Sequence, residues 1–478
     1  MKKKLITLLA MSMATVCMFT ACGGGNTSDS SIGNGGSGDK IYAGEELFVS
    51  MHLAGFDRWL DDYAVAFEEE TGCKVTINWN PSLNAEARTI FMSDSYILDD
   101  LYFAGVTDLW VDWAKEGKLL AIDGFDGILR DEAKDLGMYN GKKYTLDVLL
   151  PPMGLVYNQE YLNAIPSSGA YTQGQFPETF QGLLDLCDKI NEMGTINGIA
   201  VKPMSWGGKV EDLFDMYKLL WSQGNGGADY TAFVNQQGEE PVEEYFKSQS
   251  IKNALEGMVK LLNVKNGYST NSIKGCGEKD HIAQQQNFLN GECVFCPSGS
   301  WFATEMKDSI TKDTFEFGFA NMPLYNEAET TRTTLINVPT ENFFIPKNAE
   351  NAELAVEFLK FVFTAENCVE IHKELGTPLA IQYDFSDEDM ASMDSFSQQV
   401  TNIVFENKIV MRGSSNPMFL KNVTNGRFVD KNGNQLQAFH RIADGTYNLS
   451  NIASLMADSY LGFKGEWNDY RKAAGLSK

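Results

Sequence analysis

The feature that most constrains the fold is an alternation of strand and helix patterns. Residues 47–53 form a short apolar run with strand character, and residues 57–71 carry apolar side chains at helical spacing. Gly72 stands where a glycine ends a helix, and residues 75–79 alternate apolar and polar like a second strand. A strand, a helix and a strand in this order predict a βαβ unit, which favours a parallel or mixed sheet in an α/β protein.

The same alternation continues along the chain. Thr179 is placed as an N-cap, an apolar helical face follows it, and Gly194 is placed to end that helix. Residues 255–262 predict another amphipathic helix, and the strand-like residues 343–345 precede a further one at 355–362. No internal repeat and no long internal linker separate these segments, so we expect two lobes that share crossing chains.

The N-terminus predicts a secretory leader. Residues 2–4 are lysines and residues 5–18 are apolar, which is shorter than the ~20 residues of a membrane-spanning helix. The following Phe-Thr-Ala-Cys resembles a bacterial lipobox, which implies a lipoprotein signal peptide over residues 1–22 and a lipid anchor on Cys22. Phe19 departs from the usual leucine, so ordinary signal cleavage remains an alternative.

A flexible tether is predicted over residues 23–43. Residues 23–40 contain seven glycines and four serines, a composition that cannot bury a core. The G-x-G-x-x-G pattern of residues 33–38 lies inside this stretch, without a strand before it or a helix after it. It is therefore not a dinucleotide-binding fingerprint.

The balance of charges excludes two classes of partner. The chain holds 39 Lys and Arg against 64 Asp and Glu, a formal net charge of −25. Such acidity repels nucleic-acid phosphates and anionic lipid headgroups, so we expect no nucleic-acid partner and a membrane link through the N-terminal lipid. Aromatic residues reach 12 %, which suits a large core, a ligand surface or both.

The chain lacks the sequence motifs of common catalytic centres. Its four histidines are isolated in sequence, and no zinc-protease, serine-hydrolase or phosphate-loop motif occurs. Neighbouring acids such as Asp61 with Asp62 and Asp99 with Asp100 are raw material for a glycoside hydrolase, although solvated faces explain such pairs in so acidic a chain. We therefore predict no enzymatic activity and no cofactor.

The cysteines predict neither a zinc site nor an extensive set of disulfides. Cys293 and Cys296 form a single C-x-x-C, whereas zinc normally needs a second pair. A calcium-loop-like start at Asp430 lacks the turn glycine and the closing glutamate, so no metal is expected. Cys187 lies on a predicted core face and is expected to be a free thiol, which leaves one disulfide at most.

Four segments in order carry a resemblance to a known family. They are residues 100–103 (DLYF) with 113–120 (WAKEGKLL); 141–144 (GKKY), 154–162 (GLVYNQEYL) and 177–180 (PETF); 288–295 (FLNGECVF) with 298–301 (SGSW); and 344–348 (FIPKN), 358–361 (FLKF) and 376–378 (GTP). Together with residues 445–450 (GTYNLS), they resemble the extracellular solute-binding proteins of ABC importers, family 1, the carbohydrate type. Cys293, Cys296 and residues 267–279 depart from the family's pattern.

The resemblance implies an α/β periplasmic-binding-protein-like fold of type II, with two discontinuous lobes joined by hinge crossings. Residues 44–148 and 338–366 are assigned to the N-terminal lobe, and residues 149–337 and 367–478 to the C-terminal lobe. The ligand is expected to lie between the lobes, since only a ligand that touches both shifts the equilibrium toward closure.

The function implied is that of a lipid-anchored, monomeric receptor on the extracellular face of the cell membrane. It would capture a carbohydrate, an oligosaccharide by expectation, and deliver it to a membrane permease driven by a cytoplasmic ATPase. A periplasmic location stays open. So do a receptor for a peptide, polyamine or phosphodiester, a secreted glycoside hydrolase, and a surface-scaffold lipoprotein.

The resemblance and the predicted elements together indicate eight candidate ligand residues. Trp301 is similar to the family's stacking tryptophan, and Asp108 to a hydroxyl-gripping aspartate. A sugar ring presents an apolar C–H face to an aromatic side chain and a rim of hydroxyls to carboxylates and amides. The other candidates lie at strand ends, in a glycine-rich loop and near the second crossing: Tyr102, Phe103, Trp206, His52, Glu341 and Asn342. For Tyr102 and Phe103 a core position is the alternative.

Overall fold

The structure is a computed structural model of the 478-residue chain. The chain divides into two compact units, Met1–Lys40 and Ile41–Lys478, and the described helices and strands lie in the second. The predicted leader, Cys22 and most of the tether lie outside the described residues. These are residues 40–52, 58–91, 99–106, 109–205, 212–235, 247–269, 281–311, 314–338, 341–414, 441–457 and 472.

A five-stranded mixed sheet contains the predicted βαβ unit. Its strands, in spatial order, are β2 (Lys74–Trp79), β1 (Glu46–Met51), β3 (Leu101–Ala104), β14 (Asn342–Pro346) and β4 (Leu119–Leu120). Strand β1 pairs in parallel with β2 and β3, whereas β14 runs antiparallel to β3. Helix α1 (Leu60–Thr71) joins β1 to β2 and ends at Gly72, whose φ of 82° and N–H bond to Glu68 O confirm the predicted C-cap.

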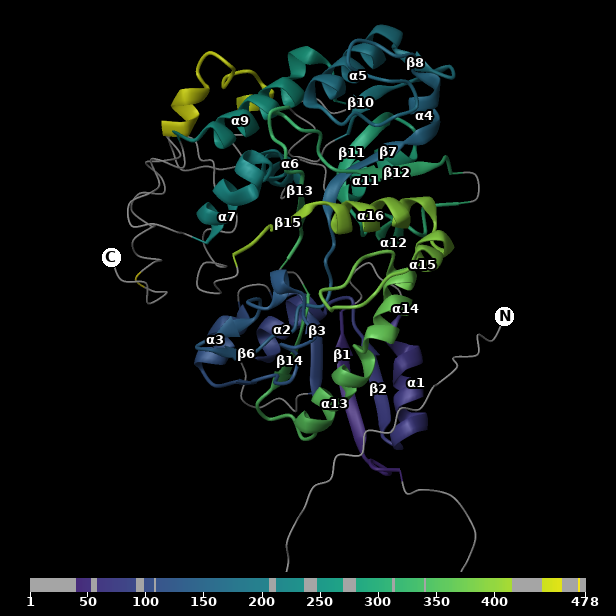
Figure 1. The fold of residues 1–478 in the computed structure, drawn as a ribbon, viewed down its shortest axis with the longest axis vertical. Coiled ribbons are helices and arrows are strands. Elements are labelled where there is room, and N and C mark those ends of the chain that lie inside the picture. Colours follow the sequence, from purple (N-terminus) through teal and green to yellow (C-terminus); the bar gives the residue numbers. More distant parts are fainter. Residues whose placement is uncertain are drawn as a thin grey trace, which may run out of the picture. The chain divides into compact units, whose positions relative to one another are not determined.

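Hydrophobic clusters cover both faces of this first sheet. Phe103 packs with Leu47 and Val49 against helices α1, α13 (Ala352–Val362) and α14 (Ala365–Leu375). Tyr102 and Phe344 pack on the other face against α2 (Leu83–Ile90) and α3 (Leu109–Lys115). Successive residues of a strand point to opposite faces, which is why the neighbours Tyr102 and Phe103 enter different cores. Figure 1 shows α1 and α13 beside the strands of this sheet.

A second mixed sheet has the order β10-β11-β7-β12. Its strands are β10 (Lys202–Met204), β11 (Cys293–Gly299), β7 (Met153–Asn158) and β12 (Phe317–Ala320). Strands β10 and β11 are parallel, and β7 runs antiparallel to β11 and β12. Helix α5 (Phe180–Met193) packs on this sheet between the predicted caps, because Thr179 Oγ1 accepts from Gly182 N at 3.1 Å and Gly194 is left-handed.

The remaining helices and strands pack around the two sheets or connect them. The helices are α4 (Gln159–Ala164), α6 (Asp212–Trp221), α7 (Ala228–Val234), α9 (Gln249–Leu262), α11 (His281–Leu289), α12 (Phe302–Glu305), α15 (Asp387–Ser392) and α16 (Ser395–Glu406). The strands are β5 (Met138–Tyr139), β6 (Lys142–Lys143), β8 (Thr195–Ile196), β9 (Ile199–Ala200), β13 (Thr333–Ile336) and β15 (Lys408–Met411). Among the described residues, none of these helices combines the length and the apolar character needed to cross a bilayer.

Three stretches of chain connect the two sheets, and we call their described residues the crossing segments: 146–152, 336–338 with 341–343, and 377–381. They are joined edge to edge by the backbone hydrogen bonds Leu146 N–Phe343 O (2.9 Å), Phe343 N–Leu146 O (3.0 Å), Leu150 N–Pro378 O (2.9 Å), Ala380 N–Val148 O (2.8 Å) and Asn337 N–Pro151 O (2.9 Å). The chain thus has the two-lobed α/β fold that the sequence predicts, with lobes built from separate stretches of sequence.

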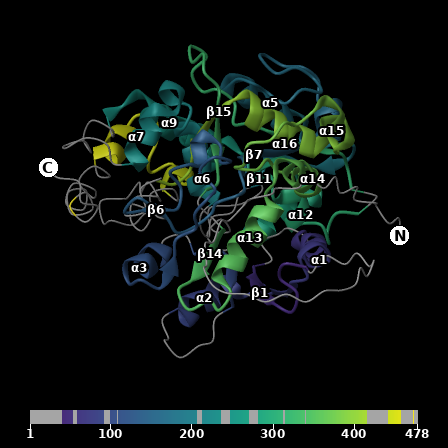
Figure 2. The ribbon, with the colours of Figure 1, turned by 60° about the horizontal axis from the view of Figure 1, so that its bottom comes forward.

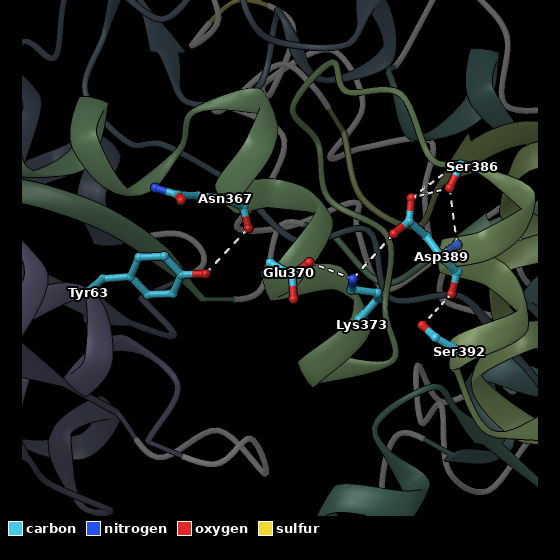
Figure 3. A network of polar contacts seen from close by, with 7 residues as sticks. All are labelled: Tyr63, Asn367, Glu370, Lys373, Ser386, Asp389 and Ser392. Atoms are coloured by element: carbon cyan, nitrogen blue, oxygen red, sulfur yellow. Dashed lines mark hydrogen bonds and ion pairs between the residues drawn. The ribbon is translucent and has the colours of Figure 1, made fainter. Parts of the chain in front are cut away.

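Polar contacts tie the helices on either side of the third crossing segment. Lys373 on α14 pairs with Glu370 and, at 3.3 Å, with Asp389 on α15 (Figure 3). Asp389 also closes a capping box with Ser386 at the start of α15. Figure 2 shows α14 and α15 side by side from a second direction. The ion pair between Lys373 and Asp389 therefore joins α14, which precedes the third crossing segment, to α15, which follows it.

The described cysteines are buried and form no disulfide with one another. Cys73, Cys187, Cys293, Cys296 and Cys368 are buried thiols, and the free thiol predicted at Cys187 is confirmed. Cys293 and Cys296 lie three residues apart on β11, and a rise of about 3.3 Å per residue separates their Cα atoms by about 10 Å. That exceeds the ~7 Å limit for a disulfide. Cys276 lies outside the described residues.

Candidate ligand-binding site

The carboxyl ends of the parallel strands in both sheets lie next to the crossing segments. Asn342, the first residue of β14, pairs with Ala104, the last residue of β3. Met153, the first residue of β7, likewise pairs with Gly299, the last residue of β11. In open α/β sheets, ligands bind outside the carboxyl ends of the strands. The residues that follow these strands therefore define the candidate site.

His52 and Glu341 meet at the carboxyl end of the first sheet. His52 directly follows β1, and its backbone N–H donates to Phe103 O at 2.8 Å, which continues the pairing of β1 with β3. Its Nδ1 lies 3.4 Å from Oε1 of Glu341, and the two side chains are 16 % and 19 % exposed. This Nδ1 is buried and makes no hydrogen bond within the described structure. Both side chains keep hydrogen-bonding capacity for a solute.

Asn84, on the first turn of α2, completes this group, which we call the strand-end cluster: His52, Asn84, Gly105 and Glu341. The Asn84 Oδ1 accepts from Gly105 N at 2.6 Å, and its Nδ2 lies 3.5 Å from Glu341 Oε1. A Cβ on Gly105 would stand 2.7 Å from Asn84 Nδ2, so this close approach needs a glycine. Asn84 is not among the residues predicted from the sequence, although its place shortly after parallel strand β2 is a usable signal.

Trp301 stands at the carboxyl end of β11 in the second sheet. Its indole lies against Gly299, where an added Cβ would come within 2.1 Å of Cζ3. Between them, Ser300 N donates to Pro152 O at 3.0 Å, and Ser300 Oγ accepts from Thr377 Oγ1 at 3.0 Å. The turn that carries the half-buried indole is therefore bonded to two crossing segments.

Tyr102 and Phe103 are core residues, which corrects their selection as ligand contacts. Tyr102 is 3 % exposed, its hydroxyl accepts from Asp99 N at 3.2 Å, and burial raises its pKa to about 12. Phe103 is 1 % exposed, with its ring centroid 4.6 Å from that of Phe343. The alternation of the strand commits both rings to packed clusters, so neither faces a solute.

Asn342 is also fully buried, and the structure does not place it with the strand-end cluster. Its Nδ2 donates to Asp147 Oδ1 at 3.0 Å, so this amide serves the contact between two crossing segments. Asp108 and Trp206, the other candidates from the sequence, lie outside the described residues. Of the eight candidates, the structure brings His52 and Glu341 together and places Trp301 at the corresponding edge of the second sheet.

The chemistry of the strand-end cluster is that of hydrogen bonding. The strand-end cluster combines one carboxylate, one imidazole and one amide, which can accept from and donate to neighbouring hydroxyls. Within the described part of the chain, no group of three His, Cys, Asp or Glu side chains is placed to hold a metal ion.

Comparisons with known proteins agree with the two-lobed α/β fold. The family described as bacterial extracellular solute-binding protein matches residues 62–397, more than half of the chain. Among solved structures, the chain is similar to SBP RafE in complex with raffinose, with 16 % sequence identity and a TM-score of 0.63. That similarity covers 88 % of this chain and 99 % of the other, and at this identity it shows a shared fold. No curated protein sequence matches the chain.

Proposed function

The chain belongs to the bacterial extracellular solute-binding proteins, and from this membership we propose that it is the carbohydrate-binding receptor of an ABC importer. The receptor captures a sugar between its lobes and closes. It then delivers the sugar intact to a membrane permease driven by a cytoplasmic ATPase. It performs no catalysis of its own and acts as a monomer.

The observation that carries this proposal is the placement of complementary groups at the carboxyl ends of the two sheets. His52, Asn84 and Glu341 at the first sheet suit the hydroxyl rim of a sugar, and Trp301 at the second suits its C–H face. Each group left unpaired by a wrong sugar would cost about 1–3 kcal/mol, which provides selectivity. The complex of the similar fold with raffinose supports an oligosaccharide as cargo.

Two candidates outside the described residues stay within the proposed site. Asp108 follows β3, and Trp206 follows β10, so both come after strands whose carboxyl ends face the crossing segments. We assign Asp108 to a sugar hydroxyl and Trp206 to a second aromatic platform.

The lobes proposed from the sequence need one change at their second boundary. Residues 44–148 and 338–366 form the first lobe, and residues 149–337 and 367–478 the second, except for α14. Its residues Cys368 and Ile371 pack in the hydrophobic cluster of the first sheet, so we place α14 with the first lobe.

Attachment to the membrane is proposed to occur through Cys22. The lipobox-like sequence before it and the Gly/Ser-rich tether after it would hold the receptor near the bilayer, on the extracellular face.

The test is titration of the protein with a panel of oligosaccharides that includes raffinose, followed by calorimetry and thermal unfolding. A sugar at 100 times its Kd adds about 2.7 kcal/mol to the free energy of unfolding. Trp301→Ala is expected to reduce the response. Trp79→Ala, the matched control, is expected to retain it, because the Trp79 indole donates to Asp61 on α1 at 2.7 Å. Binding of a non-sugar solute instead would redirect the proposal to that solute.

The same incubations distinguish a receptor from a glycoside hydrolase. A receptor returns the sugar unchanged after hours at equimolar protein, whereas a hydrolase releases new reducing ends. Turnover that is sensitive to replacement of a carboxylate would overturn the receptor proposal.

A further inference from the structure

Asp147 and Asn342 join two crossing segments by their side chains. Asn342 Nδ2 donates to Asp147 Oδ1 at 3.0 Å, and the two residues are 0 % and 4 % exposed. The neighbouring residues Leu146 and Phe343 exchange both backbone hydrogen bonds. The side-chain contact therefore lies directly beside the point where the first and second crossing segments pair.

No cation neutralises Asp147 directly. Among the described residues, no Lys, Arg or His nitrogen lies within 4.0 Å of its carboxyl oxygens. Lys143 is the charged group that acts on it, but the Lys143 Nζ donates to the carbonyls of Lys134 at 2.9 Å and Leu136 at 2.7 Å. Burying a carboxylate without an ion pair costs several kcal/mol. Folding therefore shifts the equilibrium of Asp147 toward its neutral, protonated form.

The Asn342 amide has a buried acceptor that can take a hydrogen bond from protonated Asp147. Its Oδ1 is buried and has no hydrogen-bond partner in the described structure. The second oxygen of Asp147 has only a 3.4 Å contact from Thr145 Oγ1. A proton on this second oxygen would turn it into a donor for Asn342 Oδ1. One proton would thus remove a buried charge and satisfy an orphaned acceptor.

We propose that the neutral carboxylic acid of Asp147 and the amide of Asn342 form a ring of two hydrogen bonds that clamps the first and second crossing segments, and that ionisation of Asp147 removes one of these two bonds and loosens the clamp. The proposal concerns the crossing segments alone and does not depend on the identity of the solute. Because lobe closure rotates the lobes about these segments, the clamp links the stiffness of the hinge to pH.

The direction of the pH effect follows from burial. Burial raises the pKa of Asp147 to about 6, against 3.8 for an exposed aspartate, while the bond from Asn342 and the charge of Lys143 lower it. Between these values, the folded protein holds a proton that the unfolded chain has released. This contribution to stability is complete below pH 3.8, falls as pH rises to about 6, and is absent above it.

The decisive variant is Asp147→Asn, since an amide can form the same two-hydrogen-bond ring with Asn342 at every pH. The unfolding equilibrium constants of the wild-type full chain and this variant are compared in urea from pH 4 to pH 7.5. The ratio of wild type to variant is expected to rise by up to tenfold per pH unit between pH 4 and 6 and then to level. Asp123→Asn, at an exposed carboxylate, serves as the matched control and is expected to show no such change.

Native-state hydrogen exchange at Leu146 and Phe343 gives a local readout that does not require complete unfolding. After correction for intrinsic exchange, protection in the wild type is expected to be lower at pH 7.5 than at pH 5. In Asp147→Asn it is expected to be equal at both. A ratio of unfolding constants that does not vary with pH, or equal wild-type protection at both pH values, would overturn the proposal.

Discussion

The imidazole of His52 and the carboxylate of Glu341 lie 3.4 Å apart, although they are almost 300 residues apart in sequence. His52 directly follows β1, and Glu341 directly precedes β14. Strand β3 is responsible, because β1 pairs with it in parallel and β14 pairs with it in the opposite direction. The end of β1 and the start of β14 are thereby brought to one edge.

Glu341→Gln is expected to weaken binding of the sugar by about 10- to 100-fold. The substitution removes the charge that strengthens hydrogen bonds from sugar hydroxyls, an effect of about 1.5–3 kcal/mol for a charged partner. Calorimetric titration measures the change. Glu353→Gln, an exposed carboxylate on α13, is the control and is expected to bind like the wild type. Unchanged affinity in Glu341→Gln would remove this carboxylate from the site.

Gly299→Ala is expected to displace the Trp301 indole and weaken sugar binding by about 2- to 10-fold, the value of an aromatic contact of 0.5–1.5 kcal/mol. The added methyl would stand 2.1 Å from Cζ3 of the ring, so the ring must move. Tryptophan fluorescence and calorimetry report the two effects. Gly127→Ala is the control, because nothing lies within 4 Å of its added Cβ. A variant that binds normally would show that the position of the indole is unimportant.

Buried His372 is expected to make the protein sensitive to acid. The Tyr383 hydroxyl oxygen accepts from Leu379 N at 3.0 Å and lies 2.9 Å from His372 Nδ1, while His372 Nε2 lies 2.8 Å from Thr401 Oγ1. Thr401 Oγ1 in turn donates to Ser397 O at 2.8 Å. These contacts suit a neutral ring that donates through Nε2, and burial lowers the pKa of His372 to about 3.

The stability that comes from neutral His372 is therefore complete above about pH 6.5 and is lost as pH falls toward 3, because the unfolded chain takes up the proton first. Urea unfolding between pH 7 and pH 4 should show this loss, which is reduced in His372→Gln. His281→Gln, at a half-exposed imidazole, is the comparison and is expected to retain the loss. The effect opposes that of Asp147, so the two variants must shift the pH profile in opposite directions.

Cys22→Ser is expected to release the receptor from the membrane fraction into the medium. The serine hydroxyl cannot form the thioether through which a lipobox cysteine is lipidated. Cell fractionation and the mass of the N-terminal peptide are the measurements. Cys17→Ser, inside the same leader, is expected to leave the protein anchored. Release of both variants, or of neither, would contradict a lipid on Cys22.

Local elements could be predicted because neighbouring residues determine them. The hydrophobic period and Gly72 placed the first helix, and Thr179 and Gly194 placed the ends of α5, since caps satisfy the backbone groups of their own helix. Cys187 was predicted to be a buried thiol from its place on an apolar helical face. None of these inferences needed a contact between distant parts of the chain.

The candidate site was predicted less completely because its contacts are non-local. Tyr102 and Phe103 lie at the end of a strand, and this position in sequence is the same for a core residue and for a ligand residue. Both rings are buried because helices pack on each face of the sheet, and those contacts come from distant parts of the chain. Asn84 was missed because its meeting with Gly105 and Glu341 depends on the order of the strands.

The sequence by itself determined the α/β class, the ends of individual helices and the resemblance to solute-binding proteins, because these depend on period, caps and local motifs. Only the tertiary structure decided which strand ends meet, that Asn84 joins His52 and Glu341, and that Asp147 faces Asn342. The reason is physical. Hydrogen bonds act over about 3 Å, and the pairing and register of strands decide which distant residues come that close.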